Sequence, residues 1–172
     1  MAAGPLRVGG LSRASQALAL LASVAVVAVI AAAGGVAAAN AQAFYAGLIK
    51  PTWAPPPWLF GPVWTTLYLM MAVAAWRIWR GAGSLAGAGD ALLLYGVQLL
   101  LNALWSWLFF VWQLGAVAVL EIVLLWVVLW FTLLRFWARD RLAGALLVPY
   151  LLWVSFATAL TVACWHLNPD IL

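Results

Sequence analysis

Five long apolar runs fill almost the whole of this 172-residue chain. A helix of roughly 20 apolar residues is long enough to cross a bilayer core of about 30 Å, so each run can span a membrane. Hydrophobic residues make up 69% of the chain and charged residues 7%, which is far from the composition of a water-soluble domain. The sequence therefore predicts an all-α integral membrane protein, a five-transmembrane-helix bundle in a single domain over residues 16–166. The spans are expected at about 16–39, 62–79, 91–110, 115–137 and 142–165.

The first run needs separate consideration, because Arg7 and Arg13 precede it and it ends in three alanines, as a secretory signal peptide does. Its apolar stretch of about 23 residues is longer than the apolar core of a typical signal peptide, so we favour an uncleaved first helix. Residues 1–15 are expected to form a disordered cytoplasmic tail, and residues 167–172 a second short tail.

The basic residues are distributed very unevenly along the predicted bundle. All seven arginines fall at the N-terminus or in the second and fourth connections, whereas Lys50 lies on the other side. Because cytoplasmic loops of membrane proteins carry the excess of Lys and Arg, we expect a cytoplasmic N-terminus, with the C-terminus and the first loop exterior. The net charge of +4 follows from this topology and gives no reason to expect nucleic-acid binding.

The first loop, residues 40–61, is rich in proline and tryptophan. Five prolines fall between Pro51 and Pro62. Proline lacks a backbone donor and fixes φ, so this segment cannot continue as a regular helix in hydrocarbon and should form an ordered loop at the membrane surface. Its aromatic side chains fit either a headgroup belt or one wall of a pocket for a flat ligand.

Side chains for conventional catalysis are scarce. The chain has one cysteine, Cys164, and one histidine, His166, which cannot by themselves build a zinc, haem-thiolate or nucleophile–base site. We therefore expect no metal site and no tightly bound cofactor. We interpret His166 as an interfacial polar residue, with ligand or metal contact as the alternative.

A few polar side chains interrupt the predicted spans. Gln98 and Asn102 lie four residues apart on one helix face, with Trp105 three residues further on, and this face should point into the bundle. The pair serves either as a hydrogen bond between helices or as a ligand contact. Glu121 is ionisable and lies inside a span, so it is either a functional group with proton linkage or a side chain that reaches back to the interface.

Pro149 falls inside the last predicted span, beside Tyr150 and Trp153. A proline within a helix frees a backbone carbonyl and kinks the helix. A kink next to two aromatic residues favours a cavity at this level of the bundle.

Three blocks of the chain resemble the tryptophan-rich sensory protein and translocator protein family, the TspO/MBR family, which includes the mitochondrial peripheral benzodiazepine receptor. Residues 44–68 are similar to its signature Trp-Tyr-x-x-Leu-x-Lys-Pro-x-Trp-x-Pro-Pro-x-Trp-x-x-Gly-Pro-Val-Trp-x-x-Leu-Tyr, with Phe44 in place of the first Trp. Residues 98–110 and 149–158 are similar to two further family segments. The similarity covers residues 44–166 in order, and the chain looks like a bacterial-type member.

The resemblance implies a five-helix bundle, often a homodimer, with a pocket beneath the first loop. It implies binding of porphyrins, notably protoporphyrin IX, and of synthetic isoquinoline-type ligands. Trp64 and Trp153 match the two pocket tryptophans that the family ties to light-dependent porphyrin breakdown, so they are the candidate catalytic residues. With these two, our candidate ligand-binding residues are Trp53, Trp58, Tyr68, Asn102, Trp105, Tyr150 and Ala157.

The cholesterol motif of the mitochondrial members, Leu-Asn-Tyr-x-x-x-Arg, is incomplete in this chain. The aligned residues are Leu160, Thr161, Val162 and His166, so the Tyr and the Arg are both missing. We therefore do not expect cholesterol binding.

Three functions fit these residues: a tetrapyrrole-binding sensor or regulator, an enzyme that degrades porphyrin with light and oxygen, and a transporter of amphipathic small molecules. We favour the first. The enzyme hypothesis gains from the oxidisable indoles of Trp64 and Trp153 but lacks an acid, a base, a metal or a bound redox cofactor. Transport lacks the inverted repeats and broken helices of alternating-access carriers. Titration with protoporphyrin IX, in darkness and then in light, separates binder from degrader.

Overall fold

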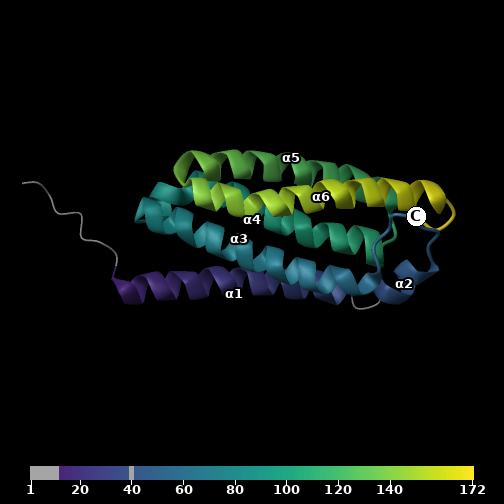
Figure 1. Ribbon diagram of the computed structural model, residues 1–172, viewed down its shortest axis with the longest axis horizontal. Helices are drawn as coiled ribbons and strands as arrows, with labels where there is room; N and C mark the ends of the chain where they lie inside the picture. Colours follow the sequence, from purple (N-terminus) through teal and green to yellow (C-terminus); the bar gives the residue numbers. More distant parts are fainter. Residues whose placement is uncertain (1–11, 39–40) are drawn as a thin grey trace, which may run out of the picture.

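The computed structural model describes residues 12–38 and 41–172, and over these residues it contains helices and connections but no strand. Five long helices run side by side (Figure 1). Each is long and apolar enough to cross a membrane, which confirms the predicted fold class. Their bounds are α1 (Arg13–Ala37), α3 (Phe60–Ala82), α4 (Leu85–Ser106), α5 (Gly115–Arg139) and α6 (Arg141–Leu167).

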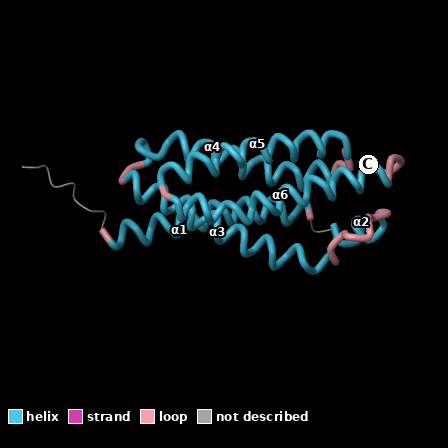
Figure 2. Tube along the Cα trace, turned by 45° about the horizontal axis from the view of Figure 1, so that its top comes forward, coloured by secondary structure: helices cyan, strands magenta, loops and turns pink. Residues whose placement is uncertain are grey.

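Three short elements lie at one end of the bundle. They are helix α2 (Ala41–Gly47), the 3₁₀ helix η1 (Pro57–Leu59) and the π-helix η2 (Trp107–Val111), which continues α4. The first loop is thus partly helical: it consists of α2, an irregular segment at 48–56, and η1. Figure 2 shows the non-helical segments gathered at the two ends of the bundle.

Helix termini differ by a few residues from the predicted spans. The tail predicted over residues 1–15 lies mostly outside the described residues, but Arg13–Ser15 are helical because the Ser12 side chain caps α1, accepting from the Ser15 N–H at 3.0 Å. Helix α4 begins at Leu85 rather than at residue 91, since Ser84 caps it in the same way. Pro62 falls in the first turn of α3, where its missing N–H costs nothing, so α3 begins at Phe60 rather than at residue 62.

The core lies between α3, α4, α5 and α6, and α1 packs along α3 and α4 at one edge (Figure 1). Helix α1 buries few side chains, whereas the other four share one continuous core. Much of that core consists of small residues, which let transmembrane helices approach closely where no water is present to drive them together. Fully or almost fully buried small residues are Ala72, Ala74, Ala88, Ala91, Ala118 and Ala143.

The end of the bundle opposite the first loop carries ion pairs between helices. Arg77 contacts Asp140 at 2.7 Å, and Asp90 contacts Arg135 at 3.3 Å and also Arg139. Partial burial raises the pKa of Asp140, but the hydrogen bond from Arg77, backbone N–H donors and the Arg77 charge outweigh it and hold this pKa below its usual value. These contacts fix α3, α4, α5 and α6 relative to one another at this end.

Candidate functional site: an aromatic cavity beneath the first loop

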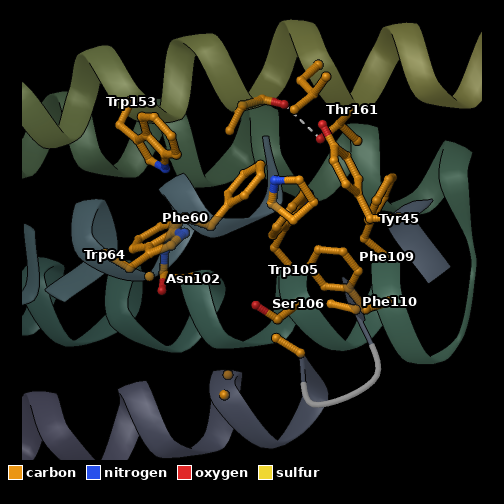
Figure 3. Close-up of a pocket in the computed structure, with 18 of the residues that line it drawn as sticks. Tyr45, Phe60, Trp64, Asn102, Trp105, Ser106, Phe109, Phe110, Trp153 and Thr161 are labelled. Carbon is orange, nitrogen blue, oxygen red and sulfur yellow. Dashed lines mark hydrogen bonds between the residues drawn. The ribbon is translucent and has the colours of Figure 1, made fainter. Parts of the chain in front are cut away.

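A cavity of about 280 Å³ lies beneath the first loop (Figure 3). The first loop lies at the same end of the bundle as the C-terminus (Figure 1). This volume is near the lower limit for pockets that hold small molecules, roughly 300–1,000 Å³. Every long helix except α5 contributes to its wall. The lining residues are Ala31, Gly34 and Gly35 of α1, with Ala38 directly after it; Ala41, Tyr45 and Pro57 of the first loop; Phe60, Gly61, Trp64 and Tyr68 of α3; Asn102, Trp105, Ser106, Phe109 and Phe110 of α4 and η2; and Trp153, Ala157, Leu160, Thr161 and Cys164 of α6.

The first loop covers the cavity through Tyr45. The Tyr45 ring packs edge-on against Phe60, with ring centres 5.7 Å apart, and its hydroxyl donates to the Pro55 carbonyl at 3.4 Å. Burial, with a smaller contribution from Cys164, raises the pKa of Tyr45 to about 12, so its hydroxyl stays a neutral donor. The Lys50 ammonium lies 4.9 Å from the centre of the Tyr45 ring and donates to the Tyr45 carbonyl at 2.6 Å. These contacts give an irregular, proline-rich segment a fixed shape.

A chain of hydrogen bonds joins three helices at the inner end of the cavity. The Tyr68 hydroxyl donates to the Asn102 side-chain oxygen at 2.6 Å, and the Asn102 amide donates to the Tyr150 hydroxyl at 3.1 Å. Tyr68 and Asn102 line the cavity, whereas Tyr150 is fully buried behind them. Asn102 therefore makes the predicted hydrogen bond between helices while facing the cavity. Gln98 is fully buried one turn away and does not line it.

Three indoles form walls of the cavity. Trp64, Trp105 and Trp153 project from α3, α4 and α6 toward the same space (Figure 3). Trp64 lies over Tyr68, with ring centres 5.5 Å apart and planes inclined by 33°, and Trp153 packs edge-on against Phe60 at 5.8 Å. Among the described residues, the indole nitrogens of Trp105 and Trp153 are buried without a hydrogen-bond partner. Buried donors are normally paired, so these two N–H groups lack the partner that such groups usually have.

The π-helix η2 shapes the wall on the α4 side. Its wider turn is closed by a hydrogen bond from the Trp112 N–H to the Trp107 carbonyl at 2.9 Å. Trp105, Phe109 and Phe110 can then all reach the cavity, with Trp105 stacked on Phe109 at 5.3 Å and 11°. Single-turn π segments inside α-helices are frequent at functional sites.

Comparison with known proteins gives the family of this chain. Residues 22–166 match the model of the TspO/MBR family. The chain belongs to this family. It is 41% identical over 127 residues to protein CrtK of Rhodobacter capsulatus, covering 74% of this chain and 79% of that protein. It is likewise 41% identical over 126 residues to the tryptophan-rich protein TspO of Chlorobaculum tepidum, covering 73% and 80%. It is 36% identical over 126 residues to the human translocator protein, covering 73% and 75%.

In this TspO/MBR-family chain, two of the predicted ligand residues lie away from the cavity. Trp58 is 68% exposed and Trp53 is 50% exposed, and neither belongs to the lining. In the 3₁₀ turn, residues three apart share a face, so Pro57 and Phe60 point into the cavity and Trp58 points outward. Trp53 packs edge-on against Phe156 of α6, with ring centres 5.7 Å apart. The remaining predicted residues lie in the lining, or, for Tyr150, directly behind it.

The wall formed by α1 was not predicted. It consists of small residues, Ala31, Gly34, Gly35 and Ala38. A β-carbon added at Gly34 would lie 3.5 Å from the Ser106 hydroxyl oxygen, whereas one added at Gly35 would meet nothing within 4 Å. The α1 wall is therefore close to α4 at Gly34 and open beside Gly35.

Two further predicted residues take definite positions. Glu121 is 7% exposed and lies outside the cavity lining, and in the described part of the chain neither of its carboxyl oxygens has a hydrogen-bond partner. It is buried rather than reaching back to the interface. His166 is exposed at the end of α6, with its ring centre 5.0 Å from that of Trp165, as an interfacial residue would be.

Proposed function

We propose that this TspO/MBR-family protein is a membrane-embedded, tetrapyrrole-binding sensory or regulatory protein, with protoporphyrin IX or a related tetrapyrrole as its ligand. The observation that carries the proposal is the convergence of Trp64, Trp105 and Trp153 on one cavity beneath the first loop. Indole faces stack on flat π-systems, and a site enclosed by aromatic walls excludes water from such a ligand.

The distribution of polar groups is consistent with this ligand. The Trp105 and Trp153 indole N–H groups offer two donors, and the Asn102 side chain adds a polar group held in place by Tyr68 and Tyr150. A molecule with an apolar plane and a few peripheral acceptors, such as a porphyrin carboxylate, matches this set.

The size of the cavity places a condition on binding. At about 280 Å³ the cavity lies near the lower limit for small-molecule pockets, so a porphyrin macrocycle would fill it closely and would use any open space beside its walls. The space beside the Gly35 α-carbon is open. Helix α1 is also held by few buried side chains. We therefore infer that the macrocycle extends past the α1 wall, with its inner edge between the indoles.

Light-dependent porphyrin degradation is a second candidate, favoured by the placement of both Trp64 and Trp153 in the lining. An electron-rich indole in contact with a photoexcited porphyrin can be oxidised by it. In the lining as described, no Asp, Glu, His or Lys is present to act as acid or base, and the hydroxyls of Tyr45 and Tyr68 are engaged in hydrogen bonds, so binding remains the primary proposal.

We also propose the orientation in the membrane. Arg77, Arg80, Arg135, Arg139 and Arg141 lie at or near the ends of helices remote from the first loop, and this basic end is placed in the cytoplasm. The first loop and the cavity are then exterior. Homodimer formation, which the family resemblance implies, stays a prediction.

The experiment that tests the function is a titration of the purified protein with protoporphyrin IX in detergent, followed by tryptophan fluorescence and porphyrin absorbance in darkness. We expect saturable quenching with a Kd of about 1 μM, which corresponds to roughly −8 kcal/mol. Unsaturable quenching equal to that of free tryptophan in empty micelles would reject the proposal. Subsequent illumination measures any loss of porphyrin against the free-porphyrin baseline.

A further inference from the structure

Asn168, the residue that follows α6, is tied to the first loop 119 positions earlier in the chain. Its side-chain oxygen accepts from the Ile49 N–H at 2.8 Å, and its amide donates to the Ile49 carbonyl at 2.9 Å. The same amide donates to the Cys164 carbonyl in the last turn of α6 at 2.7 Å. Asn168 is 4% exposed, so a carboxamide with two N–H donors and one carbonyl oxygen is satisfied at every group while buried.

The Asn168 side chain differs from the other hydrogen-bonding groups of the first loop because it joins the loop to the end of another helix. Lys50 donates to carbonyls of Tyr45, Ala46 and Leu48, all within the loop itself. Aromatic edges supply further contact with α6, as between Trp53 and Phe156. Over the described residues, the first loop and the end of α6 are joined by two hydrogen bonds, and both involve the Asn168 side chain.

The connection joins two walls of the cavity. Tyr45 and Pro57 of the first loop line the cavity, and so does Cys164 of α6, whose backbone carbonyl accepts from Asn168. Separating Ile49 from Asn168 would break both hydrogen bonds, so the Ile49 N–H and carbonyl would have to pair with water instead. The paired and the solvated arrangements are thus two distinct states of the loop.

We propose that Asn168 is a latch, a positioning residue that holds the first loop closed over the cavity and so sets how long a bound ligand stays. This proposal rests on the proposed function for the identity of the ligand, but the latch itself is a property of the ligand-free protein. It acts through Ile49 and touches no ligand.

The first experiment measures hydrogen exchange at the Ile49 amide in the ligand-free protein in detergent, for wild type, Asn168→Ala and the matched control Asp170→Ala. Asp170 is exposed and two residues along the same tail. Because Asn168→Ala removes both hydrogen bonds to Ile49, we expect its amide to exchange roughly tenfold faster or more, with exchange in α4 unchanged. Asp170→Ala should match wild type. Equal exchange at Ile49 in wild type and Asn168→Ala would overturn the latch.

A second variant keeps the test decisive if Asn168→Ala does not fold. Asn168→Asp keeps an acceptor for the Ile49 N–H but loses both donors and sets a carboxylate oxygen against the Ile49 and Cys164 carbonyls, so its Ile49 amide should exchange faster than that of wild type. A rate for Asn168→Asp equal to that of wild type would count against the proposal.

The second experiment measures dissociation of protoporphyrin IX after rapid dilution, by recovery of tryptophan fluorescence. We expect Asn168→Ala to release the porphyrin about tenfold faster at unchanged helix content, with Asp170→Ala equal to wild type. Faster exchange at Ile49 without faster release would reject control of residence time. If porphyrin binds none of the proteins, the proposed function fails, and the exchange experiment still decides whether Asn168 holds the loop.

Discussion

Replacement of Asn102 by alanine tests the hydrogen-bonded chain at the inner end of the cavity. The variant loses the bond from Tyr68 at 2.6 Å and the bond to Tyr150 at 3.1 Å. Hydrogen bonds between transmembrane helices contribute about 0.6 kcal/mol each, because the unfolded chain in the membrane also finds partners. The Tyr150 hydroxyl, however, belongs to a fully buried residue, and loss of its partner adds a desolvation cost of about 1 kcal/mol.

The expected loss of stability for Asn102→Ala is therefore about 2 kcal/mol. For a chain of this size, 1 kcal/mol shifts the melting temperature by roughly 2–4 °C, so the apparent Tm should fall by about 4–8 °C. Tyr68→Phe removes one bond and leaves the Asn102 oxygen facing the cavity, so it should cost only about 0.6 kcal/mol.

The assay is thermal unfolding in detergent, followed by circular dichroism, for wild type, Asn102→Ala, Tyr68→Phe and the double variant. Because Asn102→Ala already removes the bond to Tyr68, the double variant should lose less than the sum of the two single changes. An unchanged Tm for Asn102→Ala, or strictly additive losses, would show that this hydrogen-bonded chain does not stabilise the bundle.

Three further predictions address packing, pH and chemistry. Gly144→Ala should destabilise the protein strongly in the same melting assay, because the new β-carbon would lie 2.7 Å from the Trp137 α-carbon, and backbone cannot move away cheaply; an unchanged Tm would contradict this packing. The lowered pKa of Asp140 contributes stability above its unfolded-state pKa of about 3.9, and this contribution is lost as the pH falls through the still lower folded-state pKa. Arg77→Met should flatten this acid-side loss in a series of melts from pH 6 to pH 3, and an identical pH profile would argue against the pair. Trp153→Phe should largely keep porphyrin affinity, since Phe keeps a stacking face, but should slow any light-dependent loss of the Soret band. If the variant bleaches porphyrin as fast as wild type does, the enzyme hypothesis loses its specific support.

The fold could be predicted from the sequence because the bilayer restricts the alternatives. In hydrocarbon every backbone polar group must be paired within its own segment, so five apolar runs with basic connections leave a helical bundle as the solution. Helix termini were less predictable, because they depend on single caps such as Ser12 and Ser84 and on the tolerance of a first turn for Pro62.

The candidate site was predictable where a side chain follows the period of a regular helix. Asn102 and Trp105 lie on one face of α4, and both line the cavity. Trp58 lies outside it because a 3₁₀ turn changes which residues share a face. The inward reach of Phe110 depends on a π-helix, for which the sequence carries no distinct signal.

Two other contributions to the site depend on tertiary contacts. The α1 wall, including Gly35, belongs to a helix whose small residues suggest close packing but do not specify the partner. Asn168 was assigned to a short tail, because a pairing with Ile49 across 119 positions leaves no local pattern. A buried asparagine directly after a transmembrane helix is the one feature that could have drawn attention to it.

Whether the tetrapyrrole occupies the cavity beneath the first loop can be measured by filling the open space beside Gly35. Gly35 belongs to the cavity lining, and a leucine there meets no neighbour at its β-carbon. Gly96→Leu is the matched control, since its β-carbon also meets nothing and Gly96 lies outside the lining. The measurement is protoporphyrin IX binding by Soret absorbance for the three proteins. We predict at least about tenfold weaker binding for Gly35→Leu, a loss of roughly 1.4 kcal/mol, with Gly96→Leu equal to wild type. Equal affinity in all three proteins would place the porphyrin outside this cavity.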